Sequence, residues 1–130
     1  MLRYMLDTDT CASIMRGPSE GLMRRLQTSS LDEQVISVVT WAELLYGVRI
    51  AAKAKQNRTA LDAFVKHLRV LEWTQGAAEH YAEIRAHLRK KGQMIGSNDL
   101  MIAAHAISLE FNTELSAGAP DQITTRYRSP

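Results

Sequence analysis

Three acidic residues stand far apart in the sequence at positions from which they could act together. Asp7 follows a short apolar segment, Glu43 comes a few residues after a β-branched segment, and Asp99 lies near the start of an apolar helical segment. Three carboxylates held within ~4 to 6 Å repel one another unless a divalent cation neutralises them. Oxygen ligands without a thiolate or paired histidines favour Mg²⁺ or Mn²⁺ over Zn²⁺. Such an ion activates water and binds a phosphate oxygen, so these residues would support phosphodiester hydrolysis.

Each acid also has a structural interpretation. Asp7 and Asp9 are typical of a turn that caps the following helix. Glu43 stands three residues after Thr40, which is the spacing of a capping box. Asp99 would be favoured in a first helical turn by the helix dipole. Only the joint placement of all three acids at one edge of a sheet favours a metal site over these interpretations.

The elements that must position these acids follow from hydrophobic patterning. Apolar or alternating segments predict strands at residues 2–6, 35–39 and 68–73, with Thr40 capping the helix after the second strand. Helical spacing of apolar residues predicts helices that end near residue 16, cover residues 19–27 and 41–49, form a pair over 51–67 broken near 56–57, and cover 75–91 and the segment from 97 to 109.

Strands that alternate with helices predict an α/β fold with three layers, in which a short parallel sheet lies between helices. The carboxyl ends of parallel strands form one edge, where side chains converge. After Leu109, however, no segment has the pattern of a buried strand, so we expect the last core strand to be missing or altered. A length of 130 residues without a linker predicts a single domain over residues 1–130.

Composition excludes several classes of protein. Hydrophobic residues make up 45% of the chain and charged residues 23%, which is typical of a globular protein rather than a disordered chain. No apolar segment approaches the ~20 residues of a membrane helix. Cys11 is the only cysteine, which predicts a protein of the reducing cytoplasm.

Basic residues gather in two segments. Arg85, Arg89, Lys90 and Lys91 lie on one predicted helix, and the others are Arg49, Lys53, Lys55 and Arg58. Such residues are typical of solvated helix faces, and contact with RNA phosphates is the alternative. Cys11 and His105 are expected to be packed residues, because no histidine is placed to activate the thiol and no second histidine lies at metal-binding spacing.

Three segments of the chain resemble motifs of the PIN-domain ribonucleases of the VapC toxin family. They are MLDTD at residues 5–9, ISVVTWAELLYG at 36–47 and IGSNDLMIAAHA at 95–106, and the likeness covers residues 1–109. The resemblance implies cleavage of single-stranded RNA or tRNA loops, a Mg²⁺ or Mn²⁺ cofactor, a homodimer, and a VapB-type antitoxin as partner. It also implies that Asp7 and Asp99 are direct metal ligands, and that Glu43 holds a metal ion or its water.

The chain departs from the family pattern after Leu109. The family has a final core strand there, which pairs with the first strand, followed by a Thr-Asn-Asn-like turn and an acidic residue. The absence of this final core strand would leave the first strand as an unpaired edge of the sheet. Either a shifted reading frame replaced the original segment, or the tail over residues 110–130 has diverged and Glu114 or Asp121 supplies the late acid.

Two other functions compete with a metal-dependent toxin ribonuclease. The chain could be a catalytically impaired PIN-like binding module that still associates with an antitoxin or with itself, since the last part of the site is altered. A phospho-accepting receiver domain also has an Asp after its first strand. That class, however, needs a late strand ending in Lys, which this chain lacks.

Overall fold

The computed structural model describes residues 2–17, 34–66, 68–109, 111–115 and 123–128. The helix predicted over residues 19–27 lies outside these ranges. The elements in chain order are β1 (Leu2–Leu6), α1 (Thr8–Arg16), β2 (Gln34–Ser37), α3 (Val38–Ile50), α4 (Ala54–Val65), β3 (Arg69–Leu71), α5 (Gln75–Lys90), α6 (Ser97–Ser108), β4 (Phe111–Leu115) and β5 (Ile123–Arg128).

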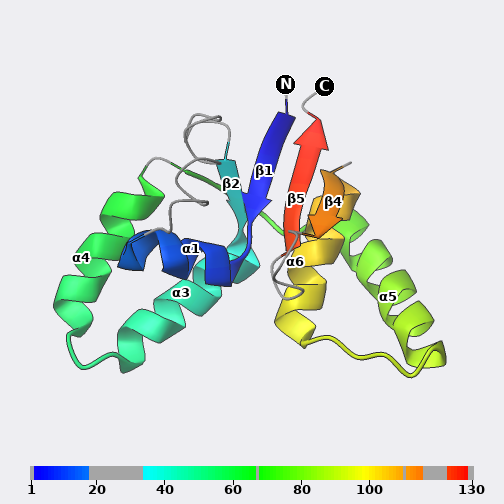
Figure 1. Ribbon diagram of the computed structural model, residues 1–130, viewed down its shortest axis with the longest axis horizontal. Coiled ribbons are helices and arrows are strands. Elements are labelled where there is room, and N and C mark those ends of the chain that lie inside the picture. Colours follow the sequence, from blue (N-terminus) through cyan, green and yellow to red (C-terminus); the bar gives the residue numbers. More distant parts are fainter. Residues whose placement is uncertain (1, 18–33, 67, 110, 116–122, 129–130) are drawn as a thin grey trace.

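One sheet of five strands, in the order β3-β2-β1-β5-β4, divides the helices into two layers (Figure 1). The first three strands in this order are parallel: Met5 is opposite Val35, and Ile36 is opposite Val70. Helices α1, α3 and α4 lie on one side of the sheet in Figure 1, and α5 and α6 lie on the other. The predicted α/β fold, with a short parallel sheet between helices, is confirmed.

Alternation along the strands produces a separate core on each face of the sheet. Met5 and Val35 point to one face and pack with Ile102 and Ala106 of α6. Leu6 and Ile36, the next residue on each strand, point to the other face. There they pack with Cys11 and with Ile14, Trp41, Leu44, Phe64, Val65, Leu68 and Val70. Because successive side chains of a strand point to opposite faces, two apolar residues in sequence supply both cores.

The end of the chain corrects one expectation about the sheet. β5 pairs with β1 in antiparallel register, with Tyr4 opposite Arg126, and β4 pairs with β5. The first strand is therefore not an unpaired edge, and that prediction is wrong. The altered tail supplies backbone hydrogen-bonding groups to β1 from an antiparallel strand.

The boundary between β2 and α3 also differs from the prediction. β2 ends at Ser37, and Val38 and Val39 already belong to α3. The Ser37 hydroxyl accepts a hydrogen bond from the Val39 amide at 3.1 Å and so caps the helix. Thr40 therefore lies inside the helix and is not its cap. The helix begins three residues earlier than predicted, with Ser37 as the cap that accepts a hydrogen bond from the Val39 amide.

The helices from α3 to α6 follow their local sequence signals to different extents. The break predicted near residues 56–57 is wrong, because α3 ends at Ile50 and α4 begins at Ala54. Helix α5 matches its prediction and is followed by Gly92, whose φ of +69° is a conformation that glycine adopts at little cost. Helix α6 is buried along most of its length, as expected.

None of the helices described is long and apolar enough to cross a membrane.

Candidate functional site

Asp7 lies directly after β1, at the carboxyl edge of the parallel strands. Its side chain is buried, with 7% of the residue exposed, and its Oδ1 accepts a hydrogen bond of 2.7 Å from the Thr10 amide. Asp7 is thus the N-cap of α1, as its structural interpretation predicts. Asp9 is exposed in the first turn of α1 and is not the cap residue. The fold therefore fixes the Asp7 carboxylate at the junction of strand and helix.

Glu43 approaches Asp7 through Thr8, the residue next to Asp7 in the chain. The Thr8 hydroxyl donates a hydrogen bond of 2.6 Å to Oε1 of Glu43, across 35 positions of sequence. The capping-box interpretation of Glu43 is wrong, because Ser37 caps α3 and Glu43 lies in the second turn of that helix. The structure therefore links two of the three predicted acids through a threonine that sequence reasoning did not select.

Asp99 lies in the first turn of α6 and is exposed. A Cβ atom built on Gly96 would be 3.5 Å from Oδ2 of Asp99, so this carboxylate lies close to the glycine that precedes the helix. In Figure 1, α6 begins on the side of the molecule toward which β1 runs. Asp99 therefore belongs to the same side as the carboxyl ends of the parallel strands.

The predicted metal ligands are Asp7, Glu43 and Asp99. Among the residues that the structure describes, no group of three or more Asp, Glu, His or Cys side chains is placed to hold one metal ion. The donors do fit a hard divalent cation chemically, because Asp7, Glu43 and Thr8 offer only oxygen atoms. The side chain of Glu114 and all of Asp121, the predicted late acids, lie outside the described part of the chain.

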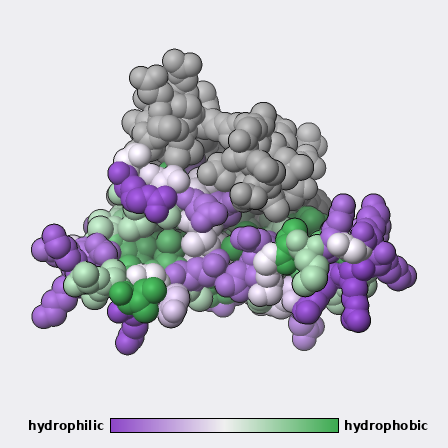
Figure 2. Space-filling view, turned by 60° about the horizontal axis from the view of Figure 1, so that its bottom comes forward, coloured by the Kyte–Doolittle hydropathy of each residue, from purple (hydrophilic) through white to green (hydrophobic). Residues whose placement is uncertain are grey.

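The surface on this side of the molecule is mixed in character. Figure 2 shows the side of the molecule toward which β1 runs. A hydrophilic strip crosses the middle of the described surface there, with hydrophobic patches on either side. The exposed large hydrophobic residues of the described chain are Tyr46, Ile50, Met94 and Ile95. Polar and apolar surface therefore lie side by side at this edge.

Cys11 lies beside Asp7 and is not a metal ligand or nucleophile in this arrangement. Burial, together with the nearby Asp7 carboxylate, raises the pKa of the Cys11 thiol from 9.0 to about 12. The thiol stays protonated at neutral pH and packs in the core beside Leu6 and Ile36. The sequence prediction of a packed cysteine is confirmed.

His105 connects α6 to the site. Its Nδ1 lies 2.8 Å from the Ser37 hydroxyl, and both residues have no exposed surface. Since Ser37 also caps α3, one buried hydroxyl holds α6 against the junction of β2 and α3. Sequence reasoning predicted a buried histidine but missed Ser37, although a serine directly before a helix is a recognisable cap signal.

The buried imidazole makes the stability of the fold depend on pH. Burial lowers the pKa of His105 below its ordinary value of 6.5, so the unfolded chain binds this proton more tightly than the folded chain. The contribution of neutral His105 is complete above pH 6.5 and is lost as the pH falls toward the lower folded-state value. We expect His105→Gln to flatten the decrease in unfolding free energy below pH 6.5, by up to about 1.4 kcal/mol per pH unit, in urea titrations.

The exposed His87 of α5 offers a matched control for this prediction. His87→Gln makes the same substitution at an exposed position, so an effect of replacing any histidine would appear in both variants. Equal flattening in the two variants would contradict the assignment to His105.

Fold and site together define an α/β/α domain with acidic residues at the carboxyl edge of its parallel strands. The family model of the PIN domain matches residues 4–113. Ribonuclease VapC2 of Rickettsia felis is 36% identical over 106 residues, covering 81% of this chain and 79% of the relative. The tRNA(fMet)-specific endonuclease VapC of Salmonella typhimurium is also 36% identical, covering 82% and 80% of the two chains.

A solved structure agrees with the sequence relatives. The DNA-bound VapBC of Salmonella typhimurium contains a chain with a TM-score of 0.76 and 36% identity, covering 83% of this chain and 81% of that chain. The chain described here therefore belongs to the PIN-domain family, as a member of its VapC ribonucleases.

Proposed function

We propose that this protein is a metal-dependent endoribonuclease that acts as the toxin of a toxin-antitoxin pair. The observation that carries the proposal is the match to VapC ribonucleases over about four fifths of the chain. The acids Asp7, Glu43 and Asp99 lie within residues 4–113, which the PIN-domain model matches. The proposed substrates are single-stranded RNA and tRNA loops. The name of the Salmonella relative, a tRNA(fMet)-specific endonuclease, supports tRNA as the substrate class.

In the proposed site, Asp7 and Asp99 hold Mg²⁺ or Mn²⁺, and Glu43 holds the ion or its water. When bound, the ion supplies an activated water and neutralises charge on the phosphate and the leaving oxygen. Asp7 is fixed by its capping bond to Thr10, and Thr8 orients Glu43. Helix α6 begins on the side of the molecule toward which β1 runs, which supports a shared role for Asp99 and Asp7.

The same relationship supports a proposal about partners. The Salmonella structure is a VapBC complex, so we propose that this chain binds a VapB-type antitoxin. A homodimer is proposed as well, on the resemblance to the family. Both are compatible with exposed apolar residues such as Tyr46 and Ile50, with 66% and 67% of their surface exposed.

The test is RNA cleavage by the purified chain under control of the metal. We expect cleavage of a single-stranded RNA oligonucleotide and of tRNA(fMet) with Mg²⁺ or Mn²⁺, loss of cleavage when EDTA removes the ion, and recovery when Mn²⁺ is restored. The EDTA step excludes contaminating ribonucleases that need no metal, because these would continue to cleave, and the recovery step shows that the loss is due to removal of the ion. Cleavage that EDTA does not affect would contradict the proposal.

The second candidate function is a PIN-like binding module without catalytic activity. The feature that favours it is the altered sequence after Leu109, where the family pattern has a final core strand and a late acidic residue. This candidate predicts that the chain binds a VapB-type antitoxin, yet cleaves no RNA at any Mn²⁺ concentration when it is purified without the antitoxin. The same purified protein therefore decides between the two functions.

A further inference from the structure

A groove of about 320 Å³ lies between α5 and the start of α6. Its volume is at the lower end of the range of small-ligand sites, roughly 300 to 1,000 Å³. The site described above does not include this groove. Its walls come from α5, from the loop that joins α5 to α6, and from the first turn of α6. The lining residues include Tyr81, Arg85, Leu88, Arg89, Met94 and Leu100.

One wall of the groove is the aromatic ring of Tyr81, which packs against a second aromatic side chain. The ring of Tyr81 meets Trp73 edge to face, with centroids 6.2 Å apart and an interplanar angle of 77°. Trp73 is itself fixed, because its Nε1 donates a hydrogen bond of 3.1 Å to the carbonyl oxygen of Met101 in α6. The aromatic wall is therefore tied to both helices that form the groove.

The guanidinium group of Arg85 contacts the ring of Tyr81. Nη1 of Arg85 donates a hydrogen bond of 2.8 Å to the Tyr81 hydroxyl, and its Cζ lies 5.8 Å from the ring centroid. Aromatic rings and guanidinium planes are the two side-chain surfaces on which nucleic-acid bases stack. Tyr81 and Arg85 thus form a preorganised stacking surface.

The charge and polarity of the groove suit one nucleotide. Arg85 and Arg89 line it, and no acidic residue does. Leu88, Met94 and Leu100 add apolar surface, and Met94 has 91% of its surface exposed. A nucleic-acid base packs against aromatic or apolar surface, and a phosphate binds a cation. The groove offers both kinds of surface to a single nucleotide.

The groove also borders the proposed cleavage site. Ser97 and Leu100 line it, and Asp99 lies between them in the first turn of α6. We propose that the groove binds a nucleotide of single-stranded RNA that neighbours the cleaved phosphate, with the base against Tyr81 and Arg85 and a phosphate near Arg89. The inference rests on the proposed ribonuclease function and adds to it the surface that selects unpaired RNA.

The test measures binding without cleavage. A fluorescein-labelled single-stranded RNA oligonucleotide of mixed sequence is titrated with the full chain in EDTA, and Kd is read from fluorescence anisotropy. We expect Arg89→Glu to raise Kd roughly tenfold, and to make the slope of log Kd against log salt shallower by about 0.7, the value for one lost phosphate contact on a single strand. Arg89 is exposed, so this variant should fold normally.

The stacking wall is tested by a second variant. Tyr81→Leu removes the ring, and base stacking of this kind predicts a rise in Kd of roughly 5-fold to 100-fold. Thermal unfolding of this variant is measured in parallel, since Tyr81 is half buried against Trp73. If Tyr81→Leu does not fold, Arg89→Glu alone decides.

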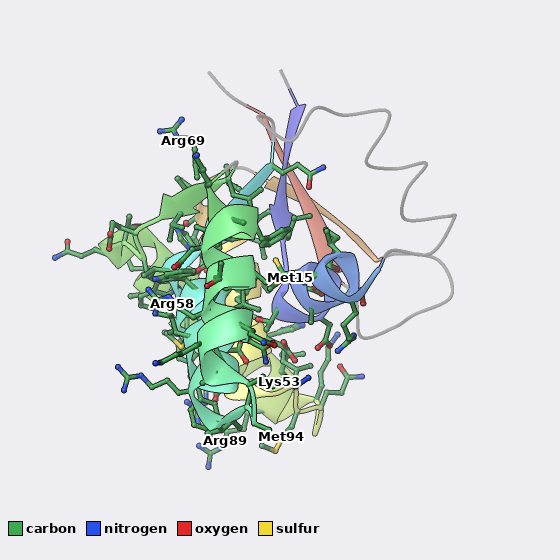
Figure 3. All side chains as sticks on the ribbon, turned by 90° about the vertical axis from the view of Figure 1, so that its left-hand side faces the viewer. Met15, Lys53, Arg58, Arg69, Arg89 and Met94 are labelled. Atoms are coloured by element: carbon green, nitrogen blue, oxygen red, sulfur yellow. The ribbon has the colours of Figure 1, made fainter. Side chains whose placement is uncertain are left out.

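Arg69 provides a matched control for the charge change. It is an exposed residue of β3, and Figure 3 shows it at the opposite end of the molecule from Arg89 and Met94. Arg69→Glu makes the same charge reversal and should leave Kd within twofold of the wild type. An equal loss of affinity for Arg69→Glu and Arg89→Glu would overturn the proposal, because it would show general attraction rather than a site.

Two further outcomes would overturn the inference. One is a wild-type chain with no measurable affinity for the oligonucleotide. The other is a change of molar mass in light scattering for Arg89→Glu with unchanged RNA affinity, which would assign the groove to a protein interface. Because binding is measured in EDTA, its failure is distinguishable from failure of the ribonuclease proposal: wild-type cleavage with unaffected groove variants refutes only the groove.

Discussion

Asp99→Asn should lower kcat/KM for RNA cleavage by at least about 100-fold while the thermal unfolding curve stays close to that of the wild type. The estimate follows from metal sites in general, where loss of even an outer-shell partner costs 10-fold to 100-fold. Asp99 is exposed, so its replacement by an isosteric amide leaves the core intact. The measurement is initial-rate cleavage of a labelled RNA with Mn²⁺, with calorimetry of Mn²⁺ uptake in parallel.

Asp9 gives the matched control for this substitution. Both residues are exposed acids in the first turn of a helix, so either change removes a similar interaction with the helix dipole, worth roughly 0.3 to 1 kcal/mol. We expect Asp9→Asn to keep full cleavage activity. An Asp99→Asn variant that cleaves as well as the wild type would remove Asp99 from the site.

Asp7→Asn extends the same prediction to a buried position. An asparagine oxygen can still accept the hydrogen bond from the Thr10 amide, so the cap of α1 is preserved while the negative charge is lost. Cleavage should fall at least as far as in Asp99→Asn. Retained structure in this variant, checked by circular dichroism, would separate the chemical role of Asp7 from its role as a cap.

Ser37→Ala should lower the free energy of unfolding by about 2 to 4 kcal/mol, a large fraction of the roughly 5 to 15 kcal/mol that stabilises a typical domain. Loss of the α3 cap costs typically about 1 kcal/mol. The change also leaves His105 without its buried partner 2.8 Å away, which costs about 1 to 3 kcal/mol more. Urea titration followed by circular dichroism measures the loss.

Thr74 separates the two contributions. Its hydroxyl accepts a hydrogen bond of 3.3 Å from the Ala77 amide and caps α5, but Thr74 itself is exposed. Thr74→Ala should therefore cost only about 1 kcal/mol, the value of a cap. If Ser37→Ala costs no more than Thr74→Ala, the buried bond to His105 contributes nothing measurable.

Local sequence signals predicted several of the elements before Leu109 and the acidic residues that these elements carry. Helix α5 was predictable because its apolar residues repeat at helical spacing and a glycine follows its end. The buried strand around Val35 was predictable because a short β-branched segment has no helical period. Asp7, at the end of the first strand, follows from the same reasoning, since a polar residue after a buried strand must lie at the edge of the sheet.

Tertiary structure decided what the local pattern left open. Val38 and Val39 have strand propensity, yet the Ser37 cap and the packing of Val39 against the core place them in α3. The contacts that define the site join residues far apart in the chain: Thr8 reaches Glu43 across 35 positions, and Ser37 reaches His105 across 68. Periodicity reports only which face of an element is apolar, so it cannot show which distant residue will meet that face.

The same physical reason accounts for the sheet order and for the groove between α5 and α6. Pairing of β1 with β5 depends on backbone groups, which every residue except proline carries alike, so no side-chain pattern marks the partner strand. The groove is lined by residues of α5, of the loop after it and of the first turn of α6, so it depends on how these segments pack together. Residue types and their spacing thus predicted the class of fold and selected the candidate acids, and the packing of one element on another determined which residues lie beside them.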